Sequence, residues 1–218
     1  MAAAGFILAP LAGAASFPCD MAKQAIEKTI CSSSETSDLD EYLGRYYAAA
    51  RGVFRHAEAC LVSDQRAWLR TVRDACKDTA CLKRTYLDRL AVLHAIQPGA
   101  TSLRNVDLPK VPPLVWIVPP ASDQVAAPRN RATTPLVASG RIVDEIASGD
   151  GIVLKSNAGE KVLIVPSMFL EQSTTDALTV LGRLPNATYE VRGRTETQAQ
   201  PVKAFATGQC AFVYRTAP

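Results

Sequence analysis

The stretch QRAWLRTVRDACKDTACLKRTYLDRL, Gln65 to Leu90, places two cysteines five residues apart where two charged helical patterns meet. Apolar residues recur at spacings of three and four on both sides of the pair, which is typical of amphipathic helices. The intervening KDTA is a natural loop between two such helices. A short connection predicts antiparallel neighbours, so the stretch predicts a helix–turn–helix with a cysteine on each side of its turn.

Cys76 and Cys81 have three interpretations: a metal site, a redox site or a disulfide. Zinc needs about four ligands, and the chain has only two histidines, His56 and His94, and no second cysteine pair of this spacing. A thioredoxin-like site needs Cys-x-x-Cys, whereas four residues intervene here. A disulfide needs only Cα atoms roughly 4.4–6.8 Å apart. The sequence favours the disulfide, which stabilises a small helical unit with a thin core.

The helical pattern extends outward from this stretch over Ser33–Leu93, with a shorter helix expected around Ala25–Ile30. Capping residues and acids open it, and three apolar stripes come after them. Trp68 occupies a stripe position and is expected in the core. The predicted unit is a small helical bundle, and its stripes are Leu39, Leu43, Tyr46, Ala50, Val53 and Ala57; Trp68, Leu69, Val72, Ala75 and Cys76; and Leu82, Tyr86, Leu90 and Leu93.

The N-terminus, MAAAGFILAPLAGAASF, has the features of a signal peptide over residues 1–15. Ala12-Gly13-Ala14 fits the small-x-small rule and predicts cleavage after Ala14 or Ala15, although no Lys or Arg precedes the apolar run. The run is too short for a stable membrane anchor. Six cysteines in an exported chain favour disulfides. The expected location is therefore periplasmic or secreted, without a stable membrane anchor after cleavage.

Residues 97–135 hold eight of the fourteen prolines and are interpreted as an extended linker. Within it, PPLVWIVPP over Pro112–Pro120 places five apolar residues between proline pairs. Leaving these side chains in water is unfavourable, so the segment is expected to dock on one of the two flanking domains. Binding of a partner as a strand is the alternative.

Strand-like alternation begins at residue 136 and predicts a β domain over 136–218. The fold class expected for the chain is α+β with two domains, the helical one over 16–96. Three strands, a helix and two strands is the order of an OB-type barrel. The expected elements are strands at Val137–Ile146, Ile152–Ser156, Lys161–Val165, Thr188–Arg194 and Ala211–Arg215, and a helix at Thr175–Leu181.

The helical half, about residues 17–94, resembles the LprI-like lysozyme inhibitor domain. The resemblance lies in a Cys followed by a Glu-Lys-x-Ile-Cys segment, a Leu-Asp helix with Tyr, a Gln-Arg-x-Trp-Leu helix and two cysteines near a turn. It implies an exported helical domain with two disulfides that is not an enzyme and, in at least one member, inhibition of lysozyme. The segments that carry it are FPCDMAKQAIEKTIC, LDEYLGRYY, QRAWLRTVRDAC and CLKRTYLDRL.

Four cysteines of the helical half allow three pairings. The expected one is Cys19–Cys31 with Cys76–Cys81, which requires a short helix between the first two, because twelve helical residues would separate them by about 18 Å. With a full-length helix, Cys31–Cys76 and Cys19–Cys81 become the better choice. Two further cysteines are extra to the family pattern and either bridge the two domains or are both free: Cys60 and Cys210.

Catalytic motifs for nucleophilic, metal or phosphate chemistry are absent from the sequence, and no cofactor is expected. The net charge of +3 is too small to indicate nucleic acid. The expected function is an exported envelope binding protein, not an enzyme, with lysozyme as the first candidate partner. The alternative is a structural or adaptor protein whose β domain binds a ligand or partner. One acidic cluster has two interpretations: it stabilises the helix dipole, or it contacts a basic partner. Its members are Glu35, Asp38, Asp40 and Glu41.

Overall fold

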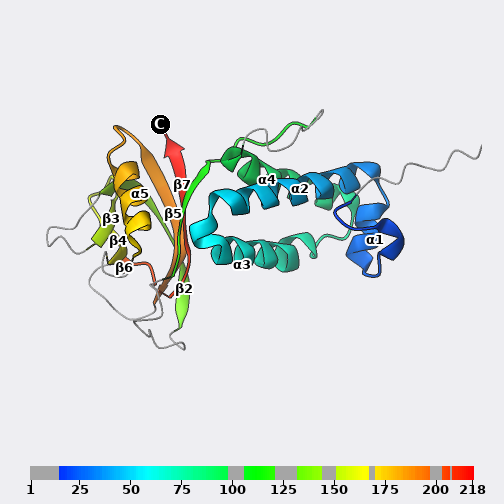
Figure 1. The fold of residues 1–218 in the computed structure, drawn as a ribbon, viewed down its shortest axis with the longest axis horizontal. Coiled ribbons are helices and arrows are strands. Elements are labelled where there is room, and N and C mark those ends of the chain that lie inside the picture. The colour runs from blue at the N-terminus through cyan, green and yellow to red at the C-terminus, as the bar shows by residue number, and fades with distance from the viewer. Residues whose placement is uncertain are drawn as a thin grey trace, which may run out of the picture.

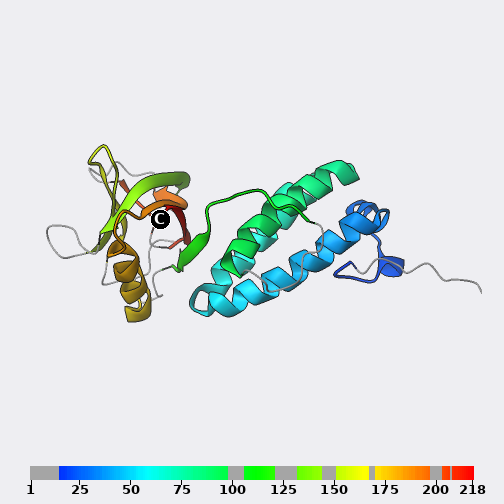
Figure 2. The same ribbon diagram turned by 90° about the horizontal axis from the view of Figure 1, so that it is seen from above.

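The computed structural model describes residues 15–97, 106–120, 132–143, 151–166, 170–196, 203–206 and 208–218. The expected signal peptide lies outside these ranges except for residue 15, as do 98–105 and 121–131 of the expected linker. The helices of the N-terminal half gather at one end of the elongated molecule, and the sheet with one further helix lies at the other (Figures 1 and 2). The α+β class is confirmed. Among the described residues, no helix has the length and apolar character needed to cross a membrane.

The helical part consists of α1 (Ala25–Cys31), α2 (Ser34–Val53), α3 (Glu58–Trp68) and α4 (Thr79–Ile96). Short 3-10 turns lie at Cys19–Met21 and Arg55–Ala57. Asp78 caps α4 by accepting the Cys81 N–H at 2.7 Å. The tight α1–α2 connection has an equally local cause, because the Thr36 and Ser37 hydroxyls both donate to the Ile30 carbonyl, at 2.7 and 3.1 Å.

The first and third apolar stripes lie in the core except for Val53. The second departs from the prediction at Val72, which is 44% exposed, and at Ala75, which is also exposed. The cause is a π-helical turn over Leu69–Arg73, in which the Asp74 N–H donates to the Leu69 carbonyl at 2.9 Å. A π turn adds a residue to the helical repeat and rotates the side chains beyond it around the helix axis. Trp68 is half-buried, packing on the core beside Tyr86 with Arg89 over its ring.

The sheet has the order β1-β7-β5-β2-β3-β4-β6, antiparallel except for the parallel β4–β6 pair. No pair joins β1 to β6 among the described strands, so the expected closed barrel is not established. Helix α5 (Gln172–Gly182) lies on the side of the sheet away from the helical part (Figure 1). The strands are β1 (Leu114–Val118), β2 (Thr133–Val143), β3 (Gly151–Lys155), β4 (Lys161–Pro166), β5 (Thr188–Glu196), β6 (Lys203–Ala204) and β7 (Ala211–Ala217).

Strand β2 changes its main partner near Gly140, pairing with β5 up to that residue and with β3 from Arg141. A Cβ at Gly140 would lie 2.2 Å from the carbonyl oxygen of Lys155. Only glycine therefore allows the two strands to approach so closely where β2 changes partner.

The apolar segment between the proline pairs forms β1, which the linker interpretation did not predict as a strand. It pairs with β7 at the sheet edge and lies between the sheet and the helices (Figure 2). Leu114 and Ile117 belong to the helical core, whereas Val118 belongs to the core of the sheet. The segment is thus docked through its apolar side chains, and on both sides.

Candidate functional site

The acidic residues at the start of α2 separate into two groups. Glu35 and Asp38 are exposed, and Glu35 pairs with Lys83 of α4 at 2.6 Å. Glu41 is half-buried and pairs with Arg45 one turn further along the same helix. Asp40 lies inside the molecule, with 3% of its surface exposed. Of the four acids, Glu35 and Asp38 are therefore the exposed ones, and Glu35 is engaged by Lys83.

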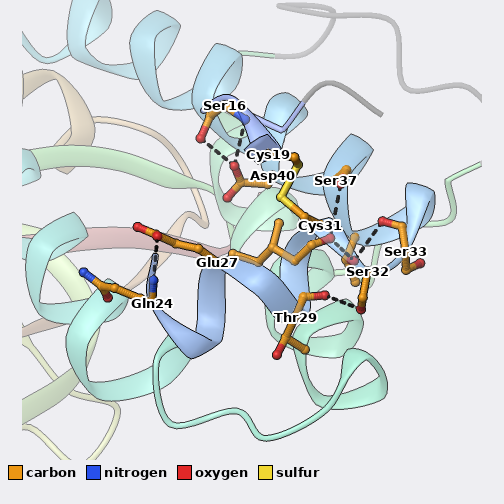
Figure 3. The surroundings of a disulfide bond; sticks show 12 residues. Ser16, Cys19, Gln24, Glu27, Thr29, Cys31, Ser32, Ser33, Ser37 and Asp40 are labelled. Atoms are coloured by element: carbon orange, nitrogen blue, oxygen red, sulfur yellow. Dashed lines mark hydrogen bonds between the residues drawn. A yellow bond between two sulfur atoms is a disulfide. The ribbon is translucent and has the colours of Figure 1, made fainter. Parts of the chain in front are cut away.

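Asp40 was expected as a partner contact, and that expectation is wrong. Its carboxylate accepts the Tyr86 hydroxyl at 2.6 Å, the Ser16 N–H at 2.9 Å and the Ser16 hydroxyl. Figure 3 shows Ser16 next to Asp40, beside the Cys19–Cys31 disulfide. Asp40 follows the buried Thr36 and Ser37 by one helical turn and so faces inward with them.

The environment of Tyr86 sets a pH dependence. Burial and then the neighbouring Asp40 carboxylate hold the pKa of Tyr86 well above its ordinary value, while Arg73 acts in the opposite direction. Above about pH 10 the unfolded chain loses this proton and the folded chain retains it, so stability falls as pH rises. We expect the titration of Tyr86 to lower the free energy of unfolding by about 1.4 kcal/mol per pH unit in that range.

The measurement is urea unfolding of the native chain and of Tyr86→Phe between about pH 8 and 11.5. At neutral pH the variant should be less stable by about 1.5–3 kcal/mol, because it lacks a hydrogen bond to a charged group. The two curves should converge above about pH 10, since only the native chain carries the Tyr86 titration. Parallel curves over the whole range would show that Tyr86 does not titrate differently in the two states.

A groove adjoins the exposed acids. Glu35, Asp38, Leu39 and Tyr42 line it from α2, where their spacing of three and four places them on one face. Its volume is about 480 Å³, and Leu39 and Tyr42 give it an apolar floor under a charged rim. The other lining residues that the structure describes are Ser34, Lys83, Leu87, Val106 and Asp107.

A second hollow of about 520 Å³ continues along α4. It shares Lys83, Leu87 and Asp107 with the groove and extends past Leu108 and Pro109. The two hollows together follow one side of α4. The sequence did not indicate them, because Lys83 and Leu87 resemble any exposed helical pair, and the segment at 106–109 reaches α4 only in the folded chain.

Both histidines have structural partners instead of lying free on the surface. His56 Nε2 lies 2.9 Å from the Ile117 carbonyl, and the imidazole stacks on Trp116 with centroids 4.1 Å apart. His94 Nδ1 lies 2.8 Å from the Tyr46 hydroxyl. His56 therefore ties the helical part to β1. That the chain is not an enzyme stays a prediction.

Three disulfides join the six cysteines. The α1 helix has only seven residues, so the chain from Cys19 can return to Cys31, with Cα atoms 5.7 Å apart. Cys76 and Cys81 bridge the α3–α4 turn at 5.5 Å. Cys60 of α3 and Cys210, next to β7, join the helical part to the sheet at 5.8 Å. The structure thus contains the first of the two open pairings, together with the bridge between the two halves.

Metal ligation finds no support in the described ranges, which contain no group of three or more His, Cys, Asp or Glu side chains placed to hold an ion. Comparison with known proteins adds no identity: no family model, no curated protein and no solved structure matches this chain. The groove beside Glu35 and Asp38 is accordingly described by its own chemistry. It offers apolar surface and carboxylates, which suit binding.

Proposed function

We propose that this chain is an exported cell-envelope protein that binds a hydrolase of the lysozyme class and inhibits it by protein contact. The observation that carries the proposal is the groove of α2 and α4, where Leu39, Tyr42 and Leu87 adjoin the exposed carboxylates of Glu35 and Asp38. An apolar floor with an acidic rim suits a basic protein surface. The resemblance of residues 17–94 to LprI-like inhibitors supplies the candidate partner.

Rigidity and export support the same proposal. Disulfides are typical of proteins in oxidising compartments, and here three of them crosslink the chain. The helices that line the groove are linked through the Glu35–Lys83 ion pair and the Tyr86–Asp40 hydrogen bond. A preorganised surface loses less entropy when it binds a partner.

Charge reversal at Asp38 tests the binding surface. Asp38→Lys should slow association with a basic lysozyme by roughly 3- to 10-fold at low salt, and less at high salt, because rim charges act mainly on the association rate. Stopped-flow binding or surface plasmon resonance at two ionic strengths measures it. Asp176→Lys on α5 is the matched control, since it makes the same charge change at an exposed position of the β part.

Enzyme inhibition is the direct test. The intact chain at micromolar concentration should suppress hydrolysis of bacterial cell walls by lysozyme. Full lysozyme activity in its presence would remove the inhibitor proposal.

In the charge-reversal experiment, equal slowing of association by Asp38→Lys and Asp176→Lys would indicate that charge attracts the partner but that the contact lies away from the groove.

A second candidate function is an envelope adaptor whose β part binds a ligand or partner. We propose for it an OB-like unit over 136–218, separate from a helical unit over 16–96. Two distinct apolar clusters support two units. Two backbone hydrogen bonds support the OB-like arrangement. The Phe205 N–H donates to the Leu163 carbonyl of β4 at 3.0 Å, and the Ala206 N–H donates to the Arg194 carbonyl of β5 at 2.6 Å. Capture of an envelope component by a groove-mutated chain would favour this function.

A further inference from the structure

The carboxylate of Asp40 is buried, and no Lys, Arg or His in the described part of the chain forms an ion pair with it. Its three donors are the Tyr86 hydroxyl and the N–H and hydroxyl of Ser16. Arg73 acts on the neighbouring Tyr86 and forms its own ion pair with Asp74. An ionised carboxylate taken out of water needs hydrogen bonds or a countercharge, and here one of its donors is the backbone nitrogen of Ser16.

The peptide bond to that nitrogen is also at the end of the apolar leader. Gly13-Ala14-Ala15 precedes Ser16 and comes after an apolar run from Ala2 to Leu11, the small-x-small arrangement that signal peptidases cleave. Ser16 is exposed although its two polar atoms contact Asp40, while Phe17 packs against the helical core. Ala15 also packs against the helical core, so cleavage at the Ala15–Ser16 bond removes that contact and leaves the packing of Phe17 in place.

We propose that the Ala15–Ser16 bond is a proteolytic modification site, and that Asp40 is the built-in receptor for the α-ammonium released there. Hydrolysis adds water across the C–N bond: the carbonyl carbon takes the hydroxyl and leaves with the leader as a carboxylate. The nitrogen of Ser16 becomes an amine and takes up a proton. Because an α-amine has an ordinary pKa of about 7.7–8.0, it is mostly cationic at neutral pH.

Cleavage then turns an amide hydrogen bond, 2.9 Å long, into a charge-assisted one at the same place. The new ion pair joins the N-terminus to α2 and, through Tyr86, to α4. The Cys19–Cys31 disulfide fixes the chain three residues further on (Figure 3). The exported form gains a stabilising contact that the precursor lacks. The inference rests on the export part of the proposed function and is independent of lysozyme binding.

The cleavage site is tested first, by intact mass and N-terminal sequencing of the full chain exported from a bacterial host under its own leader. The expected first residue is Ser16. Retention of the leader would overturn both this inference and the export proposal. A first residue of Ala15, or any position beyond Ser16, would overturn this inference alone.

The receptor role is tested with two full mature chains, one that begins at Ser16 and one with Ala14-Ala15 restored in front. The extension should lower the melting temperature by on the order of 5 °C, because it replaces the ion pair by an amide hydrogen bond. In an Asp40→Asn background the extension should change the melting temperature little. Asp38→Asn, two residues away and exposed, should retain the full difference. An extension effect that is absent, or undiminished in Asp40→Asn, would contradict the proposal.

Chemical labelling covers the case in which Asp40→Asn does not fold. The Ser16 amine of the native chain should react with an acylating reagent near pH 8 at least about tenfold more slowly than in urea, because a paired ammonium is a poor nucleophile. Equal rates would show that the amine is free and would overturn the receptor role. Neither measurement involves lysozyme, so a failure here leaves the inhibitor proposal standing.

Discussion

Replacing Cys60 and Cys210 together by alanine is expected to lower the free energy of unfolding by about 5 kcal/mol. The bridge joins residues 150 positions apart, so its removal gives the unfolded chain a large amount of conformational freedom. The same relation gives about 3 kcal/mol for Cys19–Cys31 and about 2 kcal/mol for Cys76–Cys81, whose separations are 12 and 5 residues.

Urea unfolding of the three paired alanine variants, under non-reducing conditions, measures this order. The two shorter bridges serve as matched controls, because each variant loses one disulfide and the same pair of side chains. Cys60 is 2% exposed, so part of the stability lost in its variant comes from lost side-chain packing. Cys76 is 6% exposed, so the Cys76–Cys81 control loses a similar amount of packing. A cost for the Cys76–Cys81 variant equal to that of Cys60–Cys210 would show that loop length does not govern the effect.

The helical half was largely predictable because its signal is local. Leu82, Tyr86, Leu90 and Leu93 recur with the helical period and are all buried. The prediction failed at Val72 and Ala75, where the π turn over five residues shifts the helical repeat. The backbone rearrangement leaves the residue types unchanged, so the period of the sequence carries no sign of it.

The linker interpretation missed β1 because its evidence was only local. Proline pairs on both sides of the segment disfavour a central strand, and β1 is indeed an edge strand. Its partner β7 lies about a hundred residues later and aligns Ile117 with Phe212. Pairing over such a distance depends on the assembled fold.

The candidate site shows the same limit. Asp38 and Asp40 differ by about 200° around the helix, so one faces solvent and the other the core. The helical positions of Thr36 and Ser37 could have distinguished the two acids, because both residues lie on the same inward-facing side of the helix as Asp40. The groove itself could not be predicted, since Lys83 and Asp107 contribute to it from segments that only folding brings to α2.

Strand β1 leads to the last expected result: Ile117→Ala should destabilise the chain by about 3–4 kcal/mol. Ile117 is fully buried and packs with the helical core, although its strand belongs to the sheet. Truncation removes its transfer free energy and leaves a cavity among side chains from both parts. Val115→Ala is the matched control on the same strand, and its half-buried side chain should cost only about 1 kcal/mol.

Hydrogen exchange of the Ile117→Ala variant locates the loss. His56 contacts the Ile117 carbonyl and Cys60 joins Cys210, so the helical part and the sheet are linked at two nearby places. Protection should therefore fall in both α3 and β7, because opening β1 removes contacts from each. A loss confined to β7 would mean that the helical unit retains its stability without β1. A cost below about 1 kcal/mol would mean that the cavity collapses and that β1 contributes little to joining the two parts.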